Sequence, residues 1–295
     1  MIIDLFLILL PMIVVTLGGY LFALFFAISE ETLVRAVTDF FMPLLVFFSL
    51  STSDIYLKDT VKLAGAVTFV LLLLLAASYL YCRFSGQEFR AVTPPIIFMN
   101  SGFLGIPLMQ LWGGLSAMNL IVIYDQIQTF YIFTIGIILV TGGLTFRGLF
   151  EMIKSPLLWA IILGFLFKYG GIVLPEAVLR VFQFGGSGAP SLAAFALGCS
   201  LRKRKIKAGP YLAAGLLLRF GFGFLAGLLA VHLFQITGLA RTVVLVASSL
   251  PSAVFSVVLP LRYSVDARYA GSMIITSSLL GVLVIPFIFY LSSLV

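Results

Sequence analysis

Long segments of this chain carry no charged residue, and short connections separate them. Residues 5–29 form one such segment and residues 91–124 form another. A helix needs about 20 apolar residues to cross the hydrocarbon core of a bilayer, so both segments can span it. The chain is 62% hydrophobic and only 10% charged, whereas a soluble protein must cover its surface with polar groups. These features predict an all-α polytopic membrane protein, and the lack of apolar–polar alternation argues against a transmembrane barrel.

Charges and Gly/Pro turns divide the chain into ten expected transmembrane helices. They are expected at residues 5–28, 33–53, 62–82, 91–112, 119–142, 155–171, 176–200, 208–233, 240–261 and 268–293. The uncharged run 91–124 is too long for one crossing, and WGGLSAMN at 112–119 is the expected turn inside it. Every connection is short, so no soluble domain is expected.

Basic residues gather in the odd-numbered connections, above all in the run RKRKIK at 202–207. Cytoplasmic loops carry an excess of Lys and Arg, so this asymmetry predicts odd loops in the cytoplasm and both termini outside a cell membrane. The same rule explains the net charge of +7 without a nucleic-acid partner. The basic run is expected to contact anionic membrane lipid.

An internal repeat relates the two halves of the chain. The segment around Pro43 corresponds to the segment around Pro190, because in both a proline enters an apolar run that ends in a polar loop. A unit of five helices reverses its orientation on the second pass, since five is odd. Inverted repeats are typical of secondary transporters. The predicted repeats are residues 1–147 and 148–295.

The fourth and ninth expected helices contain residues that disfavour helix. In the fourth, Gly102 and Gly105 each lower helix stability by roughly 1 kcal/mol relative to alanine, and Pro107 removes a backbone donor. In the ninth, Pro251 lies in mid-span and Ser252 follows it. Unwound backbone is tolerated inside a membrane only where protein or a water-filled cavity surrounds it. The two breaks are therefore predicted to cross near the midplane.

Such a crossing would offer free backbone N–H groups at half-helix N-termini, which suit a small anion. Asn100 adds an amide that can donate and accept, and nearby serines add hydroxyls. A single break of this kind also occurs where helices simply pack tightly, so the prediction depends on both breaks together. The expected substrate-binding residues are Asn100, Ser101, Gly102, Gly105, Pro107, Asp125, Gln128, Pro251 and Ser252.

Ionisable residues inside the expected spans are candidates for function. Asp125 either lines the substrate or a coupling-proton path, or anchors the outer end of its helix. Arg219 either attracts an anion or pairs with an acid, or extends towards the cytoplasm in the manner of a snorkelling arginine. His232 lies near a helix end and is expected to be a polar cap. No metal-ligand cluster or cofactor-binding motif is visible, so no metal and no cofactor are expected.

The motifs NSGFLGIPL at 100–108, YDQIQTFYIF at 124–133 and LPSAVFSVVLPLRYSVD at 250–266 resemble the auxin efflux carrier family, within the superfamily that includes bile acid, arsenite and riboflavin-type transporters. The resemblance covers essentially the whole chain. It implies ten helices, outside termini, an X-shaped crossover of helices four and nine, and often a homodimer. It also implies a scaffold of helices 1, 2, 6 and 7, with helices 3–5 and 8–10 as a transport domain. Implied substrates are small organic anions such as auxin, malonate or malate. The second motif has no asparagine after Pro251, which departs from the commoner family pattern.

The sequence thus predicts a secondary active or potential-driven transporter of a small carboxylate, and not an enzyme. Two alternatives stay open. One is a receptor or sensor built on a transporter frame, which would bind a ligand without moving it. The other is an intramembrane serine protease, because GGSG at 185–188 supplies Ser187 and a later helix supplies His232.

Overall fold

The computed structural model describes residues 2–52, 57–141, 153–154, 156–202, 209–262 and 265–294. Within these ranges the chain is nearly all helical, and its only strand-like pairing is an isolated bridge between Met99 and Ser252. Residues 203–208, which hold most of the basic run, lie outside the described residues. The expectation of an all-α polytopic membrane protein is therefore supported, because the described helices are long and apolar.

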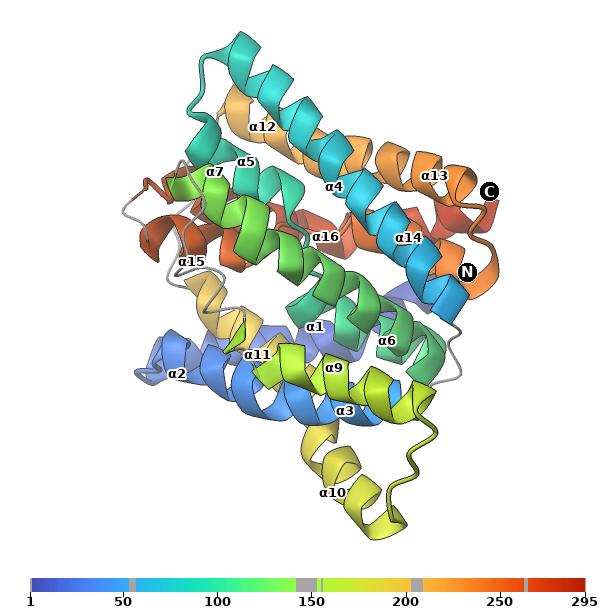
Figure 1. Ribbon diagram of the computed structural model, residues 1–295. Helices are drawn as coiled ribbons and strands as arrows, with labels where there is room; N and C mark the ends of the chain where they lie inside the picture. Colours follow the sequence, from blue (N-terminus) through green and yellow to red (C-terminus); the bar gives the residue numbers. More distant parts are fainter. Residues whose placement is uncertain are drawn as a thin grey trace.

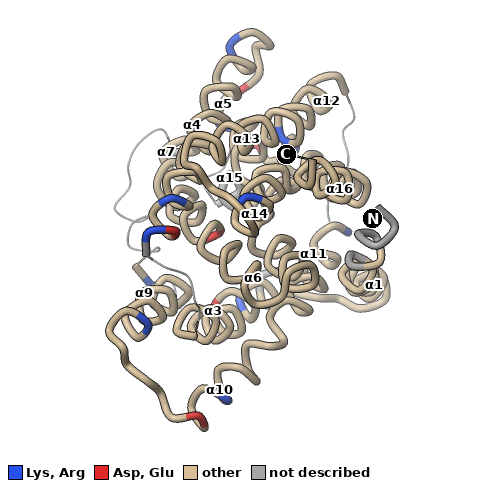
Figure 2. The backbone as a smooth tube through the Cα atoms, turned by 90° about the vertical axis from the view of Figure 1, so that its right-hand side faces the viewer, with Lys and Arg blue, Asp and Glu red and all other residues tan. Residues whose placement is uncertain are grey.

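Five helical stretches of the described chain are long and apolar enough to cross a membrane. They are Thr32–Ser51, Lys58–Ser85, Ser101–Val140, Pro210–Leu233 and Arg268–Leu294. Shorter apolar helices cover Leu10–Phe25, Pro156–Tyr169 and Gly238–Ser248. Figure 2 shows most helices nearly end-on and few charged residues among them, as expected where the surrounding medium is lipid.

The helices pack in two groups, which Figure 1 shows one below the other. In the lower group α1 packs against α11, and α3 packs against α9 and α10. This group contains α1 (Ile2–Phe25), α2 (Glu30–Arg35), η1 (Ala36–Phe41), α3 (Met42–Ser51), α9 (Pro156–Tyr169), α10 (Glu176–Ser187) and α11 (Ala189–Arg202). We call it the α1 group.

The upper group is built around α4, α6 and α14, which contact one another. Its first elements are α4 (Leu57–Ser85), α5 (Phe89–Ile97), η2 (Ser101–Gly105), α6 (Ile106–Tyr131), η3 (Ile132–Gly136) and α7 (Ile137–Thr141). Its later elements are α12 (Pro210–Leu217), η4 (Leu218–Phe222), α13 (Gly223–Leu233), α14 (Gly238–Ser248), α15 (Phe255–Arg262) and α16 (Arg268–Leu294). We call it the α4 group. The elements η1 to η4 are π-helical turns, of which η2 begins a helix and the others lie inside longer helices.

The turn expected at 112–119 is confirmed. Gly113 and Gly114 have non-helical backbone angles inside α6, and Gly114 has a φ of 64°. Glycine adopts a positive φ without a steric penalty, so the pair lets the chain kink between two helical segments. The chain termini lie on the same side of the molecule in Figure 1.

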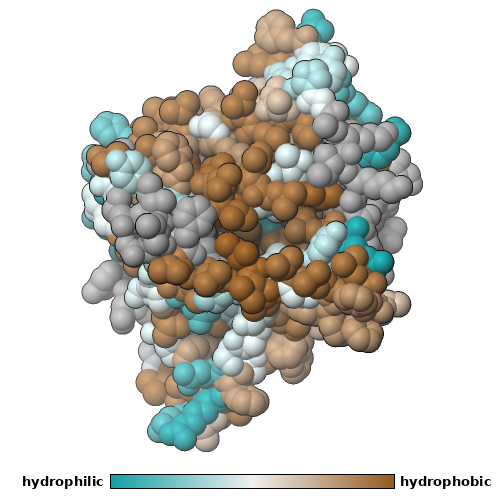
Figure 3. All heavy atoms as spheres, turned by 180° about the vertical axis from the view of Figure 1, so that it is seen from behind, coloured by the Kyte–Doolittle hydropathy of each residue, from teal (hydrophilic) through white to brown (hydrophobic). Residues whose placement is uncertain are grey.

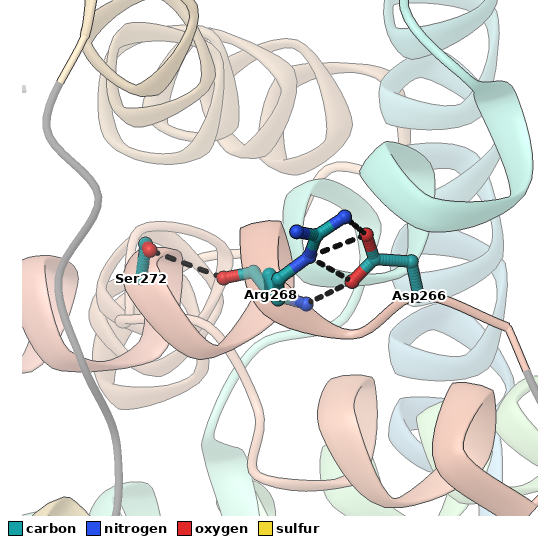
Figure 4. A network of polar contacts seen from close by, with 3 residues as sticks. All are labelled: Asp266, Arg268 and Ser272. Atoms are coloured by element: carbon teal, nitrogen blue, oxygen red, sulfur yellow. Dashed lines mark hydrogen bonds and ion pairs between the residues drawn. The ribbon is translucent and has the colours of Figure 1, made fainter.

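The surface matches a membrane environment. Figure 3 shows apolar atoms over the middle of one face and hydrophilic atoms towards its edges. At an exposed position, Asp266 caps the start of α16, because its carboxylate accepts the Arg268 N–H at 2.9 Å and also bonds the Arg268 guanidinium (Figure 4). A carboxylate at a helix N-terminus satisfies a free N–H and complements the helix dipole.

Candidate functional site

Two helices of the α4 group are interrupted, one in each half of the chain. The first ends at Ile97 and resumes at Ser101, and the second ends at Ser248 and resumes at Phe255. The first interruption comes earlier than expected, because the chain already leaves the helix at Phe98. Gly102 and Gly105 lie in the π-helical turn η2 that restarts the helix. Pro107 lies in the helix that continues from η2 into α6, so it does not mark the interruption.

The two interruptions meet through their backbones. The Asn100 N–H donates to the Pro251 carbonyl at 2.8 Å, and the Ala253 N–H donates to the Phe98 carbonyl at 2.9 Å. This short antiparallel pairing satisfies peptide groups that no helix satisfies at this point. It also joins residues that lie about 150 positions apart in the chain, so each half fixes the shape of the other.

Gln128 of α6 fastens the first interruption from the side. Its Oε1 accepts the Met99 N–H at 3.0 Å, and its Nε2 donates to the Met99 carbonyl at 2.7 Å. The same Nε2 donates to the Ser101 hydroxyl oxygen at 2.9 Å. The buried Gln128 amide therefore binds both the N–H and the carbonyl of Met99, a residue that lies outside any helix.

Asp125 lies one turn before Gln128, buried beside the start of η2. Its Oδ1 accepts a hydrogen bond from the Ser101 hydroxyl at 2.7 Å, and its Oδ2 accepts one from Gln126 Nε2 at 3.2 Å. A Cβ atom on Gly102 would lie only 3.2 Å from Asp125 Oδ1, so the glycine permits this close approach. Among the described residues no Lys, Arg or His forms an ion pair with this carboxylate.

The side chain of Asn100 is also buried, and it has a donor to spare. Its backbone carbonyl accepts hydrogen bonds from the N–H groups of Leu104 and Gly105 at 3.3 and 3.0 Å. Its Nδ2 group has no hydrogen-bond partner in the part of the chain that the structure describes. Buried polar groups nearly always have a partner, so this amide calls for a ligand or water as its acceptor.

The second interruption is held by hydroxyl groups. Ser277 of α16 accepts the Ser252 N–H at 3.0 Å, and the Ser252 hydroxyl donates to the Pro95 carbonyl at 2.6 Å. The Ser256 hydroxyl donates to the Pro94 carbonyl at 3.1 Å. In this conformation the Ser252 hydroxyl therefore stabilises the end of α5 and does not point to open space.

Arg219 lies in η4 and is fully buried. One terminal nitrogen of its guanidinium donates to the Ile96 carbonyl, and the other donates to the Ser248 carbonyl. The snorkelling interpretation is wrong, because the side chain turns inward to the two interruptions. The π-helical turn at η4 changes the direction in which this residue points, an effect that the sequence pattern does not reveal.

Comparison with known proteins places these features in a family. The model of the membrane transport protein family matches residues 4–144 and again residues 141–289. The chain belongs to this family, which includes the auxin efflux carriers that its motifs resemble. It is similar to an uncharacterized transporter of Methanothermobacter thermautotrophicus, with 28% identity over 94% of this chain and 95% of the relative. An uncharacterized transporter of Methanocaldococcus jannaschii is 26% identical over 92% of this chain and 94% of the relative.

In this transporter the serine protease alternative fails on geometry. The Ser187 hydroxyl donates to the Phe184 carbonyl of its own helix at 2.8 Å, and both Ser187 and His232 are exposed. Their helices lie far apart, because α10 protrudes below the α1 group while α13 lies in the α4 group (Figures 1 and 2). A Ser–His nucleophile requires hydrogen-bond contact, which these two residues do not have. Among the described residues no three His, Cys, Asp or Glu side chains gather to hold a metal ion.

The transporter's interruptions thus gather the sequence-predicted residues Asn100, Ser101, Gly102, Asp125, Gln128, Pro251 and Ser252, together with Arg219. Sequence reasoning missed Ser277. The repeat could have found it, because Ser277 follows Ser252 by 25 residues and Asp125 follows Ser101 by 24.

Proposed function

We propose that this transporter moves a small organic anion, a carboxylate, by alternating access, with the two interruptions as its binding site. The observation that carries the proposal is the buried Asn100 amide, whose Nδ2 has no acceptor among the described residues. Leaving a buried donor unpaired costs about 1–3 kcal/mol. Its presence where two helices unwind supports a ligand that accepts hydrogen bonds, and carboxylate oxygens do so strongly.

The backbone supports the same class of ligand. Asn100 directly precedes η2, so it lies at the N-terminal end of the helix that continues into α6. The first N–H groups of a helix lack intrahelical acceptors and carry a partial positive charge. An anion bound beside Asn100 would therefore meet both the amide and this helix end.

Asp125 gives the proposal a coupling step. Its carboxylate lies at the same helix end, bonded to Ser101. Two unit negative charges 4 Å apart repel by about 4 kcal/mol at an effective dielectric constant of 20. We therefore propose that Asp125 carries a proton whenever the anion is bound, so that the proton and the anion occupy the site together.

The position of the site suits alternating access. The turn η2 packs against α11, so the first interruption lies at the boundary between the α4 group and the α1 group. A movement of one group past the other would carry this boundary from one side of the membrane to the other. The α1 group then acts as the scaffold and the α4 group as the transport domain.

The test is flux in liposomes. The purified protein is reconstituted, and uptake of a panel of small mono- and dicarboxylates is followed at controlled pH and voltage. Asn100→Ala is expected to abolish the flux seen with the wild-type protein while its thermal stability stays within a few degrees. Asn119→Ala is the matched control, since Asn119 is a buried asparagine of α6 away from the interruptions. Equal flux in wild type and Asn100→Ala would refute the proposal, and binding without flux would favour a receptor.

A further inference from the structure

The guanidinium of Arg219 joins the ends of two half-helices that belong to different halves of the chain. Ile96 is the penultimate residue of α5 and Ser248 is the last residue of α14. Both carbonyl groups accept from Arg219, one from each terminal nitrogen. The carbonyl groups of the last helical turn lack intrahelical donors and form the negative end of the helix dipole. A single positive charge therefore neutralises two converging negative helix ends.

This charge has no carboxylate partner. Arg219 is fully buried, and none of the described Asp or Glu side chains forms an ion pair with it. Burying an ion is costly unless opposite charge and hydrogen bonds compensate for the lost water. Here the backbone dipoles of the two helix ends supply the compensating negative charge. The stabilisation is mutual, because the cation also neutralises the two negative helix ends.

The helix that carries Arg219 leaves room for the guanidinium one turn later, at Gly223. A Cβ atom on Gly223 would lie 2.8 Å from a terminal nitrogen of Arg219 and 2.3 Å from the Ser248 carbonyl oxygen. A side chain at this position would therefore separate α13 from α14 and push the guanidinium away from Ser248. The absence of a side chain at Gly223 is thus required for the contact between Arg219 and the Ser248 carbonyl.

Converging carbonyl groups at half-helix C-termini are a general means by which transporters bind a small coupling cation. We propose that the Arg219 guanidinium occupies such a cation position permanently, so that removing it opens a binding site for a free monovalent cation between the Ile96 and Ser248 carbonyls. The inference rests on the proposed function. It holds that Arg219 supplies the positive charge where the two interruptions cross, and that no co-transported ion supplies it. Arg219 is then a positioning residue that holds the two half-helices in register.

The experiment measures thermal unfolding of the detergent-solubilised protein in choline, sodium, potassium or millimolar guanidinium chloride. The wild-type midpoint is expected to be the same in all four salts. Arg219→Ala is expected to lower the midpoint by about 10 °C in choline, since it leaves two helix ends uncompensated. Sodium or guanidinium is expected to restore at least half of that loss, with the restored fraction saturating as the cation concentration rises.

Arg219→Met is the matched control, because its side chain fills the space without a charge. Its midpoint is expected to fall without recovery in any salt. The proposal is overturned if the alanine and methionine variants respond to the cations alike, or if sodium stabilises the wild-type protein.

Two further variants cover the case in which Arg219→Ala does not fold. Arg219→Lys keeps a charge in place and is expected to fold and to ignore sodium, and a sodium-dependent midpoint in this variant would contradict the proposal. Gly223→Ala is expected to displace the guanidinium from Ser248 and to lower the midpoint, and an unchanged midpoint would contradict it too.

Flux measurements separate this inference from the proposed function. Carboxylate flux through the wild-type protein is expected to be equal in sodium and choline, whereas flux through Arg219→Ala is expected to require sodium or guanidinium. If no carboxylate moves but the stability pattern holds, the substrate proposal fails alone. If carboxylate moves but no variant responds to cations, the cation inference fails alone.

Discussion

The two interruptions perform the same structural task with different chemistry. The first is fastened by an amide and a carboxylate, since Gln128 binds the Met99 peptide unit and Asp125 binds Ser101. The second is fastened by a hydroxyl, since Ser277 accepts the Ser252 N–H. In the first half the fastening residues come from the part of α6 after the Gly113–Gly114 kink, and in the second half Ser277 comes from α16. The first interruption places a buried carboxyl group, that of Asp125, beside the unpaired Asn100 Nδ2, so we place the ligand chemistry there and assign the second a supporting role.

Gln128→Leu is expected to have the largest effect on this comparison. It leaves the buried Met99 N–H without a partner, at a cost of about 2–3 kcal/mol, and it removes one of the donors to the Met99 carbonyl, which still accepts the Ser101 N–H. Thermal unfolding in detergent should show a much lower midpoint than in the wild-type protein. Gln110→Leu, on the same helix and half-buried, is the control and should not lower it. Equal midpoints for the two variants would mean that the first interruption holds its shape without Gln128.

Asp125→Asn is expected to change function more than stability. The side-chain carbonyl of the asparagine can still accept the Ser101 hydroxyl, so the unfolding midpoint should stay near that of the wild-type protein. If Asp125 takes up the proton that accompanies the anion, wild-type affinity rises as the pH falls. The asparagine variant imitates the protonated form, so its affinity should stay constant with pH and its proton-driven flux should fall about tenfold, which corresponds to about 1.4 kcal/mol. A variant with the wild-type pH profile would remove Asp125 from the mechanism.

Ser277→Ala tests the second interruption and is expected to cost about 1 kcal/mol, because only the Ser252 N–H loses its acceptor. The midpoint of thermal unfolding should fall by less than in Gln128→Leu, and flux should persist. Ser278→Ala is a close control, since the Ser278 hydroxyl has no partner among the described residues. A loss of flux in Ser277→Ala at unchanged stability would show that the two interruptions share the ligand equally.

Asp266→Ala is expected to lower the unfolding midpoint the least, so it is the reference against which the other variants are compared. Its carboxylate caps α16 at an exposed edge, where such a contact contributes about 0.5–1 kcal/mol. High salt should reduce the difference from wild type further, because exposed charges are screened. A larger fall in the unfolding midpoint than for Ser277→Ala would reverse the ranking of exposed and buried contacts proposed here.

The amino-acid sequence alone determined the class of protein, the approximate ends of its helices and which two expected helices break. Uncharged length sets which segments suit lipid, and clustered proline and glycine lower the helix propensity of a segment. The expected helices 62–82 and 268–293 correspond closely to α4 at 57–85 and α16 at 268–294. The glycine turn after residue 112 was equally local, because Gly114 needs only its own positive φ.

Only the tertiary structure decided what fastens the breaks. Gln128 lies 29 residues from Met99, and Arg219 lies 123 residues from Ile96. No local rule gives the direction of these side chains, because each π-helical turn rotates the residues around it. Packing also placed the first break at Phe98, ahead of the glycines, because there its peptide groups find partners in the other half of the chain.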